Sequence, residues 1–334
     1  MATTIHDVAR VAGVGIGTVS RVLNNSSGVR ATTREKVVQA ISQLNYTPDP
    51  IARSMISKRT GSIGVVVPFF TRPFFMEVLQ GMEMAMEEYG SDLILYNVKT
   101  DAQRDRHFSE LPTHRKVDGL VILSLSPNDA IARNFRKMVL PVVLVDAYSP
   151  LLTSLVVNNV EGAYTAVKHL IELGHRRIGF INGIIEGNFK FNQANDRLIG
   201  FHRAFGEADL LFEPELVVMA EWNRKGGREA ALHLLSLELR PTALFVASDV
   251  QATGALEAAK LLGMVVPDDL SIIGYDGIEL SELLGMSTIQ QPMRQLGECG
   301  VRKLIEQIKN PQQLPELLRF GTTLIVRNTT APLV

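Results

Sequence analysis

A repeated alternation of short apolar runs with longer amphipathic segments, which starts near Ser62, constrains the fold more than any other feature. Strands that alternate with helices form parallel sheets with helices on both faces. About ten such units exceed what one sheet of a single domain usually holds, so we expect two similar α/β lobes. We expect helices over 74–89 and 160–173, and strands over 63–68, 92–98, 117–125, 140–147, 176–182, 216–220, 242–248 and 270–276.

The first 60 residues follow a different pattern, in which glycines at positions 13, 15 and 17 follow a helical segment. Such glycines occur both in nucleotide-binding loops and at the corner of a helix-turn-helix. A dinucleotide fingerprint must follow a β-strand and needs a third glycine, where this chain has Thr18. The apolar residues at 5, 8, 9 and 12 instead have helical spacing, and Thr4 and Asp7 can cap that helix. The pattern therefore predicts a helix-turn-helix.

Each part of this motif has an expected place. Gly13 can adopt the left-handed conformation that ends the first helix. The third helix should begin at the capping box from Thr32 to Glu35, bury residues 37, 38, 41 and 44, and stop at Asn45. The second helix should run from about 16 to 24 with residues 19, 22 and 23 inward, so that its outward residues are Thr18, Ser20, Arg21 and Asn24.

The charge distribution favours a nucleic-acid partner for this segment. Residues 1–60 contain eight Arg and Lys against three Asp and Glu, whereas the remainder contains 26 against 32. A basic head on an acidic body is the electrostatic footprint of a protein that binds the phosphate backbone.

The run from Thr4 to Met55, "TIHDVARVAGVGIGTVSRVLNNSSGVRATTREKVVQAISQLNYTPDPIARSM", resembles the DNA-binding head of LacI/GalR bacterial regulators. That family has DVA-x-x-AGVS-x-x-TVSRVLN, then LNY-x-P and AR-x-L. Two positions depart from the pattern. Gly15 replaces the usual Ser before the recognition helix, and Gly17 offers no side chain at a base-reading position.

The resemblance implies a homodimer that binds palindromic operator DNA, with a hinge helix within residues 49–60 that inserts Met55 into the minor groove. Arg21 is expected to contact a base through both of its terminal nitrogens, and Ile16 a thymine methyl group. The other expected DNA-binding residues are Thr4, Gly17, Thr18, Ser20, Asn24, Thr33, Tyr46 and Arg53.

The resemblance also implies a periplasmic-binding-protein-like core of two doubly wound lobes. The expected domains are a head over 1–48, a hinge over 49–60 and an effector-binding and dimerisation core over 61–334. In such a core the chain crosses between the lobes three times, which we place near 160, 290 and 322. Lobe 1 then comprises about 61–160 and 291–322, and lobe 2 about 161–290 and 323–334.

Ligands of open α/β sheets bind beyond the carboxyl ends of the strands. Polar residues end three of the expected strands: Asp146, Ser248 with Asp249, and Asp276. The family's ligand contacts correspond to Arg197, Asp276, the pair Phe74 and Phe75, and Trp222, although Ser248 stands where the family often has Asn. The long loop before Arg197 adds Asn188 and Phe189 as candidates. Carboxylates, an arginine and aromatic rings suit a small polar effector such as a sugar or sugar derivative.

Other classes of protein fit less well. The chain has none of the usual hydrolase, metalloprotease or P-loop motifs, so we expect no enzyme, cofactor or metal. Its single Cys, the missing signal peptide and the lack of a membrane-spanning run predict a cytoplasmic protein that lies at the nucleoid when bound to DNA. The alternative, a sugar-binding protein of the same core fold without a transcriptional role, would need a signal peptide and no basic head. We therefore predict a transcription regulator of the repressor type.

Overall fold

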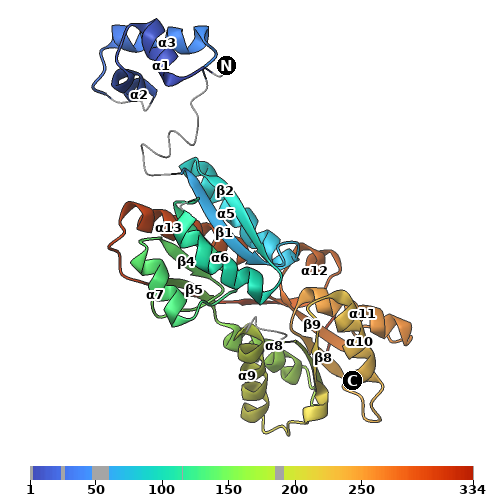
Figure 1. The fold of residues 1–334 in the computed structure, drawn as a ribbon. Helices are drawn as coiled ribbons and strands as arrows, with labels where there is room; N and C mark the ends of the chain where they lie inside the picture. Colours follow the sequence, from blue (N-terminus) through green and yellow to red (C-terminus); the bar gives the residue numbers. More distant parts are fainter. Residues whose placement is uncertain (1–2, 24–26, 47–59, 115, 185–191, 334) are drawn as a thin grey trace. The chain divides into compact units, whose positions relative to one another are not determined.

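The computed structural model describes residues 3–23, 27–46, 60–114, 116–184 and 192–333. The chain divides into two compact units, Met1–Thr60 and Gly61–Val334 (Figure 1). We call the first unit the head and the second unit the core. Within the described ranges, no helix is long and apolar enough to cross a membrane.

The head is built from α1 (Ile5–Ala12), α2 (Ile16–Leu23) and α3 (Ala31–Gln43). Val8, Val19 and Val37, one from each helix, are fully buried in its centre. Gly13 ends α1 with φ +66°, the left-handed conformation expected there, so α2 can follow after a short turn. The predicted helix-turn-helix is confirmed.

Two details of the predicted third helix are wrong. α3 begins at Ala31 with Arg30 at the N-cap position, so the box from Thr32 to Glu35 lies inside the helix. Val38 is 50% exposed, and Ala40 is buried in its place. A residue three positions after Val37 returns to nearly the same helix face, whereas the next residue lies about 100° away from it.

Lobe 1 contains a six-stranded sheet in the order β11-β5-β4-β3-β1-β2, in which all neighbouring strands are parallel. β1 and β3 are almost completely buried, which explains their continuous apolar sequences. The elements are β1 (Ser62–Pro68), α5 (Pro73–Tyr89), β2 (Asp92–Val98), α6 (Asp101–His114), β3 (Gly119–Leu123), α7 (Asp129–Lys137), β4 (Val142–Val145), β5 (Thr153–Val157), α13 (Met293–Lys309) and β11 (Leu317–Phe320).

Lobe 2 contains a second six-stranded sheet in the order β12-β10-β9-β8-β6-β7, parallel except for β12 at its edge. Its elements are α8 (Asn159–Glu172), β6 (Ile178–Gly183), α9 (Asn192–Glu207), a 3₁₀ turn at Pro214–Leu216, β7 (Val217–Ala220), α10 (Arg224–Leu235), β8 (Ala243–Val246), α11 (Asp249–Leu261), β9 (Ser271–Asp276), α12 (Glu279–Leu283), β10 (Ser287–Gln290) and β12 (Thr323–Ile325).

The chain passes between the two sheets after β5, after β10 and after β11. The four strands at these crossings, β5, β10, β11 and β12, were not among the expected strands. They have three to five residues each and include polar side chains. Ser154, Ser287 and Thr288 are fully buried there, and each hydrogen bonds to a group distant in sequence or in the adjoining loop. Such polar runs lack the apolar signature of a central strand.

Helices α5 and α13 hold the two segments of lobe 1 together. A side chain at Gly81 would overlap the backbone of Arg294, and one at Gly297 would overlap the backbone of Val78. Glycine therefore allows the two helix backbones to touch. Around this contact, Met82 and Leu296 join the apolar core beneath the sheet.

Candidate ligand pocket and DNA-binding surface

A pocket with an empty volume of about 650 Å³ lies between the two lobes, at the carboxyl ends of the strands of both sheets. Residues from both lobes line it: Arg72, Pro73, Phe74, Phe75, Ser124 and Asp146 from lobe 1, and Gln193, Arg197, Trp222, Ser248, Val250 and Asp276 from lobe 2.

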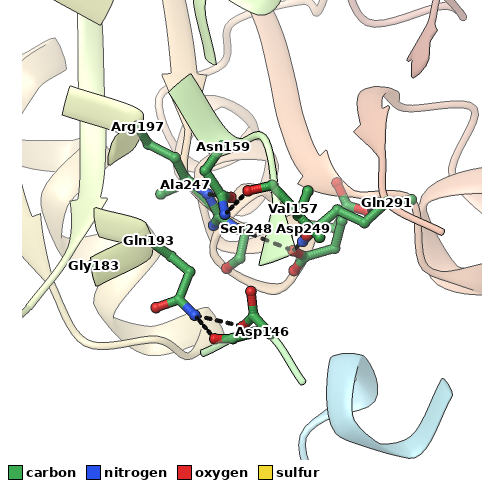
Figure 2. Close-up of polar contacts among 12 residues, drawn as sticks. Asp146, Val157, Asn159, Gly183, Gln193, Arg197, Ala247, Ser248, Asp249 and Gln291 are labelled. Atoms are coloured by element: carbon green, nitrogen blue, oxygen red, sulfur yellow. Dashed lines mark hydrogen bonds and ion pairs between the residues drawn. The ribbon is translucent and has the colours of Figure 1, made fainter. Parts of the chain in front are cut away.

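Arg197 projects from α9 and is only 3% exposed. Its Nε donates a hydrogen bond to Oδ1 of Asn159 at 3.0 Å, and its terminal NH1 group donates to the carbonyl of Ala247 (Figure 2). The guanidinium stacks on the ring of Tyr275 at 3.8 Å from the ring centre and lies 3.8 Å from Oδ1 of Asp276. These contacts fix the guanidinium as a positive group on the pocket wall.

Asp276 ends β9 with a positive φ of 116°, an uncommon conformation for a residue with a side chain. Gln291 donates a hydrogen bond from Nε2 to its Oδ1 at 2.7 Å. Burial raises the pKa of Asp276 to about 8, even though the neighbouring Arg197 opposes the shift. Burial thus works against ionisation of this carboxyl group, and the guanidinium of Arg197 works for it.

Asp146 follows β4 and also has a positive φ, of 56°. Its Oδ2 accepts hydrogen bonds from Ser124 Oγ at 2.6 Å and from Gln193 Nε2 at 2.5 Å. The same nitrogen of Gln193 donates to the backbone carbonyl of Asp146 at 2.8 Å, so lobe 2 is tied to lobe 1 at this point. Burial raises the pKa of Asp146 to about 6, whereas these donors and Arg197 lower it.

The two carboxyl groups present acceptors to the pocket. Among the described residues, the hydrogen bonds that reach Asp146 fall on Oδ2, and those that reach Asp276 fall on Oδ1. One oxygen of each carboxyl group, Oδ1 of Asp146 and Oδ2 of Asp276, can thus accept a bond from a ligand. A ligand with several hydroxyl groups satisfies such an arrangement.

Aromatic rings form the apolar part of the wall. The Phe74 and Phe75 rings meet edge to face, with centres 5.3 Å apart. On the lobe 2 side, Trp222 donates a hydrogen bond from Nε1 to the carbonyl of Ile184 at 3.2 Å. A side chain at Gly183 would overlap the indole, so this glycine makes room for the ring.

Ser248 lies at the pocket and Asp249 does not. The Ser248 hydroxyl caps α11 by accepting a hydrogen bond from the backbone N–H of Gln251. Asp249 was expected to contact the effector, but it is fully buried and does not line the pocket. Its Oδ2 accepts bonds from the backbone N–H groups of Gly277 and Ile278, and its Oδ1 accepts one from Thr288. Asp249 therefore holds the end of β9 in place, which corrects the expectation.

Five residues that line the pocket were not among the expected ligand contacts: Arg72, Pro73, Ser124, Gln193 and Val250. Ser124 directly follows β3, so the rule that selected Asp146 after β4 could have found it. Arg72 is half-buried over the ring of Phe69, and burial lowers its pKa while Glu221 partly offsets this. Asn188 and Phe189 lie outside the described residues.

The expected DNA contacts divide into those on α2 and those elsewhere. Ile16, Gly17 and Arg21 are exposed, and Thr18 and Ser20 are half-buried. Ile16, Gly17, Ser20 and Arg21 lie along one arc of α2, on the side away from the buried Val19 and Val22. Elsewhere in the head, Thr4 is exposed, and Thr33 and Tyr46 are half-buried. Three further candidates lie outside the described residues: Asn24, Arg53 and Met55.

Thr4 has a role in the fold as well. The carboxylate of Asp7 accepts hydrogen bonds from the backbone N–H of Thr4 at 3.0 Å and from its hydroxyl at 2.7 Å. These bonds satisfy groups at the start of α1, where Thr4 is the N-cap residue.

Comparison with known proteins agrees with this arrangement. Residues 4–49 match the model of bacterial regulatory proteins of the lacI family, and residues 167–330 match that of a periplasmic binding protein-like domain. The ribose operon repressor of Haemophilus influenzae is 37% identical over 330 residues, which cover 98% of each chain. The chain belongs to the lacI family.

Other members of the lacI family agree over the whole length. The transcriptional repressor PurR of Aliivibrio salmonicida is 33% identical over 331 residues, 98% of each chain. A structure of the lac repressor dimer bound to operator and the anti-inducer ONPF is 29% identical, with a TM-score of 0.87 over 99% of this chain and 100% of that one. The predicted family and architecture are confirmed, and this lacI-family protein is a transcription regulator.

Proposed function

We propose that this regulator is a homodimeric repressor that binds a palindromic operator and that a sugar in the interlobe pocket changes its affinity for the operator. The pocket carries the proposal because it combines two carboxyl acceptors, a fixed guanidinium and aromatic walls in a chain that also has a helix-turn-helix. The lac repressor structure, a dimer bound to operator, supports the dimer and the operator. The same function places the protein in the cytoplasm, on the nucleoid.

A sugar fits the chemistry of the pocket on both of its sides. Neighbouring hydroxyl groups can donate to Asp146 and Asp276 and accept from Arg197. The C–H face of a sugar ring can pack against an aromatic ring such as Phe74 or Trp222, both of which line the pocket. The similarity to a ribose operon repressor makes D-ribose the first sugar to test.

A titration of the intact chain tests the effector. Trp222 is the chain's single tryptophan and lines the pocket, so its fluorescence reports binding directly. We expect a saturable change with D-ribose or another monosaccharide, and no change with free purine bases. Binding of a purine base without binding of any sugar or sugar phosphate contradicts the sugar proposal.

Selection from random DNA duplexes tests the operator. We expect enrichment of a palindrome and an affinity that falls steeply with salt, because phosphate contacts release counterions. The sugar found by titration should change the affinity for the selected palindrome. Enrichment of no sequence, or a sugar that binds without changing DNA affinity, contradicts the proposed switch.

A further inference from the structure

A second, smaller pocket lies behind the effector pocket, and the two share a wall. Ser124, Asp146 and Gln193 line both pockets. The second pocket has an empty volume of about 400 Å³, compared with about 650 Å³ for the first. Its polar lining consists of hydroxyl, amide and carboxyl groups from Ser126, Tyr148, Asn159, Asn192 and Asp196. The second pocket thus offers a ligand the same kinds of polar groups as the effector pocket.

Hydrogen bonds hold the wall together across the two lobes. Gln193, at the start of α9 in lobe 2, donates from Nε2 to the backbone carbonyl and to Oδ2 of Asp146 in lobe 1. Ser124 donates to the same Oδ2. Figure 2 shows the amide nitrogen of Gln193 directed at Asp146 and its oxygen directed away. A ligand can extend from one pocket into the other only if the side chain of Gln193 moves.

The orientation of the Gln193 amide follows from its partners. Both groups that it faces on Asp146 are oxygen acceptors, so a flipped amide would place a carbonyl oxygen against them. The two N–H bonds of Nε2 are used in these contacts. Oε1 is buried and has no hydrogen-bond partner among the described residues. Because Oε1 has almost no accessible surface, Gln193 contributes to the effector pocket through the space that it fills and through its bonds to Asp146.

We propose that Gln193 determines the size of the effector. The inference rests on the proposed sugar-binding function and deepens it. In the wild-type protein, Gln193 closes the first pocket behind a single sugar ring. A disaccharide needs the second pocket for its other ring, and it gains that space only by breaking both bonds from Gln193 to Asp146. The wall therefore selects monosaccharides.

Substitution of Gln193 tests the inference through the fluorescence of Trp222. Gln193→Ala removes the wall and joins the two pockets, whereas Gln193→Leu keeps most of the bulk and removes the two bonds to Asp146. Asn195→Ala is the matched control because Asn195 is exposed on the same helix and lines neither pocket. Each full-length variant is titrated with D-ribose, D-glucose, maltose and cellobiose, after thermal unfolding has shown that it folds.

We expect the wild type and Asn195→Ala to bind the better monosaccharide at least tenfold more tightly than either disaccharide. Gln193→Ala should lower this preference at least tenfold, by weaker binding of the monosaccharide and tighter binding of a disaccharide. Gln193→Leu should weaken the monosaccharide without admitting the disaccharide. An unchanged preference in Gln193→Ala, or the same loss in Asn195→Ala, overturns the inference while sugar binding stands. A wild type that binds none of the sugars overturns the proposed function and the inference with it.

Discussion

Replacing Arg197 by Ala should destabilise the core and abolish the response to the effector. The substitution leaves Oδ1 of Asn159 and the carbonyl of Ala247 without their buried donor, and it removes the cation that faces Asp276. Each buried acceptor left unpaired costs about 1–3 kcal/mol. Removing one partner of a buried ion pair costs about 3–5 kcal/mol in total, which already includes such losses.

The raised pKa of Asp276 places the expected loss of stability near the lower end of the range for a broken buried ion pair. Burial raises that pKa, and removal of the Arg197 charge raises it further, so the carboxyl of Asp276 becomes neutral in the variant and leaves little stranded charge. The loss then comes mainly from the two hydrogen bonds and from the stacking on Tyr275. We therefore expect the free energy of unfolding to fall by about 3 kcal/mol, near the lower end of the range for a broken buried pair.

Thermal unfolding measures this loss. For a domain of this size, about 3 kcal/mol corresponds to a decrease in Tm of roughly 6–12 °C. Arg203→Ala is the control, because Arg203 lies on the same helix with an exposed side chain paired to Glu161 and Glu207, and its Tm should not change. Below its Tm the Arg197→Ala variant should still bind operator, because the head has its own core. An unchanged Tm would refute the stabilising role of Arg197, and a normal sugar response would refute its place in the pocket.

Three further predictions concern base reading, pH and the aromatic wall. Arg21→Ala should weaken binding to the selected palindrome by roughly 1–3 kcal/mol and leave binding to random DNA nearly unchanged; equal losses in a filter-binding assay would exclude base reading. A sugar hydroxyl that donates to Asp146 favours the ionised form of this residue, whose pKa is about 6. Sugar affinity should therefore fall up to about tenfold from pH 6 to pH 5, as Asp146 becomes protonated. Calorimetric titrations measure this fall, and Asp146→Asn should remove it. Gly183→Ala should displace Trp222, shift its emission and weaken sugar binding at least tenfold, whereas Gly206→Ala, where a side chain meets nothing, should do neither.

The sequence predicted those elements whose burial is visible in the pattern itself. β1, β2 and β6 lie within two residues of their expected bounds. β10 was missed because Ser287 and Thr288 are buried through bonds to Thr330 and Asp249, partners that only the folded chain supplies. Val38 was expected to be buried because its spacing along the helix allowed it. Only the packing of α1 against α3 shows that Ala40 is buried instead.

The pocket was predictable for residues that end strands and unpredictable for those that cross the cleft. Asp146 and Asp276 follow from the rule that ligands bind beyond the carboxyl ends of parallel strands. The same rule selected Asp249, because a strand end does not reveal whether a carboxylate turns toward the ligand or toward the backbone behind it. Gln193 begins a helix in one lobe and bonds to a residue 47 positions earlier in the other lobe, and no local pattern contains that contact.

The discontinuity of lobe 1 has a consequence during synthesis on the ribosome. Its sheet and apolar core need α13 and β11, which follow all of the strands of lobe 2 except β12. At about 5–20 residues per second, translation from the end of the head to these elements lasts tens of seconds or less. Throughout that interval the head has all of its own core residues, while Val78 and Met82 still lack the helix that covers them. The DNA-binding head can therefore be folded on a nascent chain before the interlobe pocket is complete.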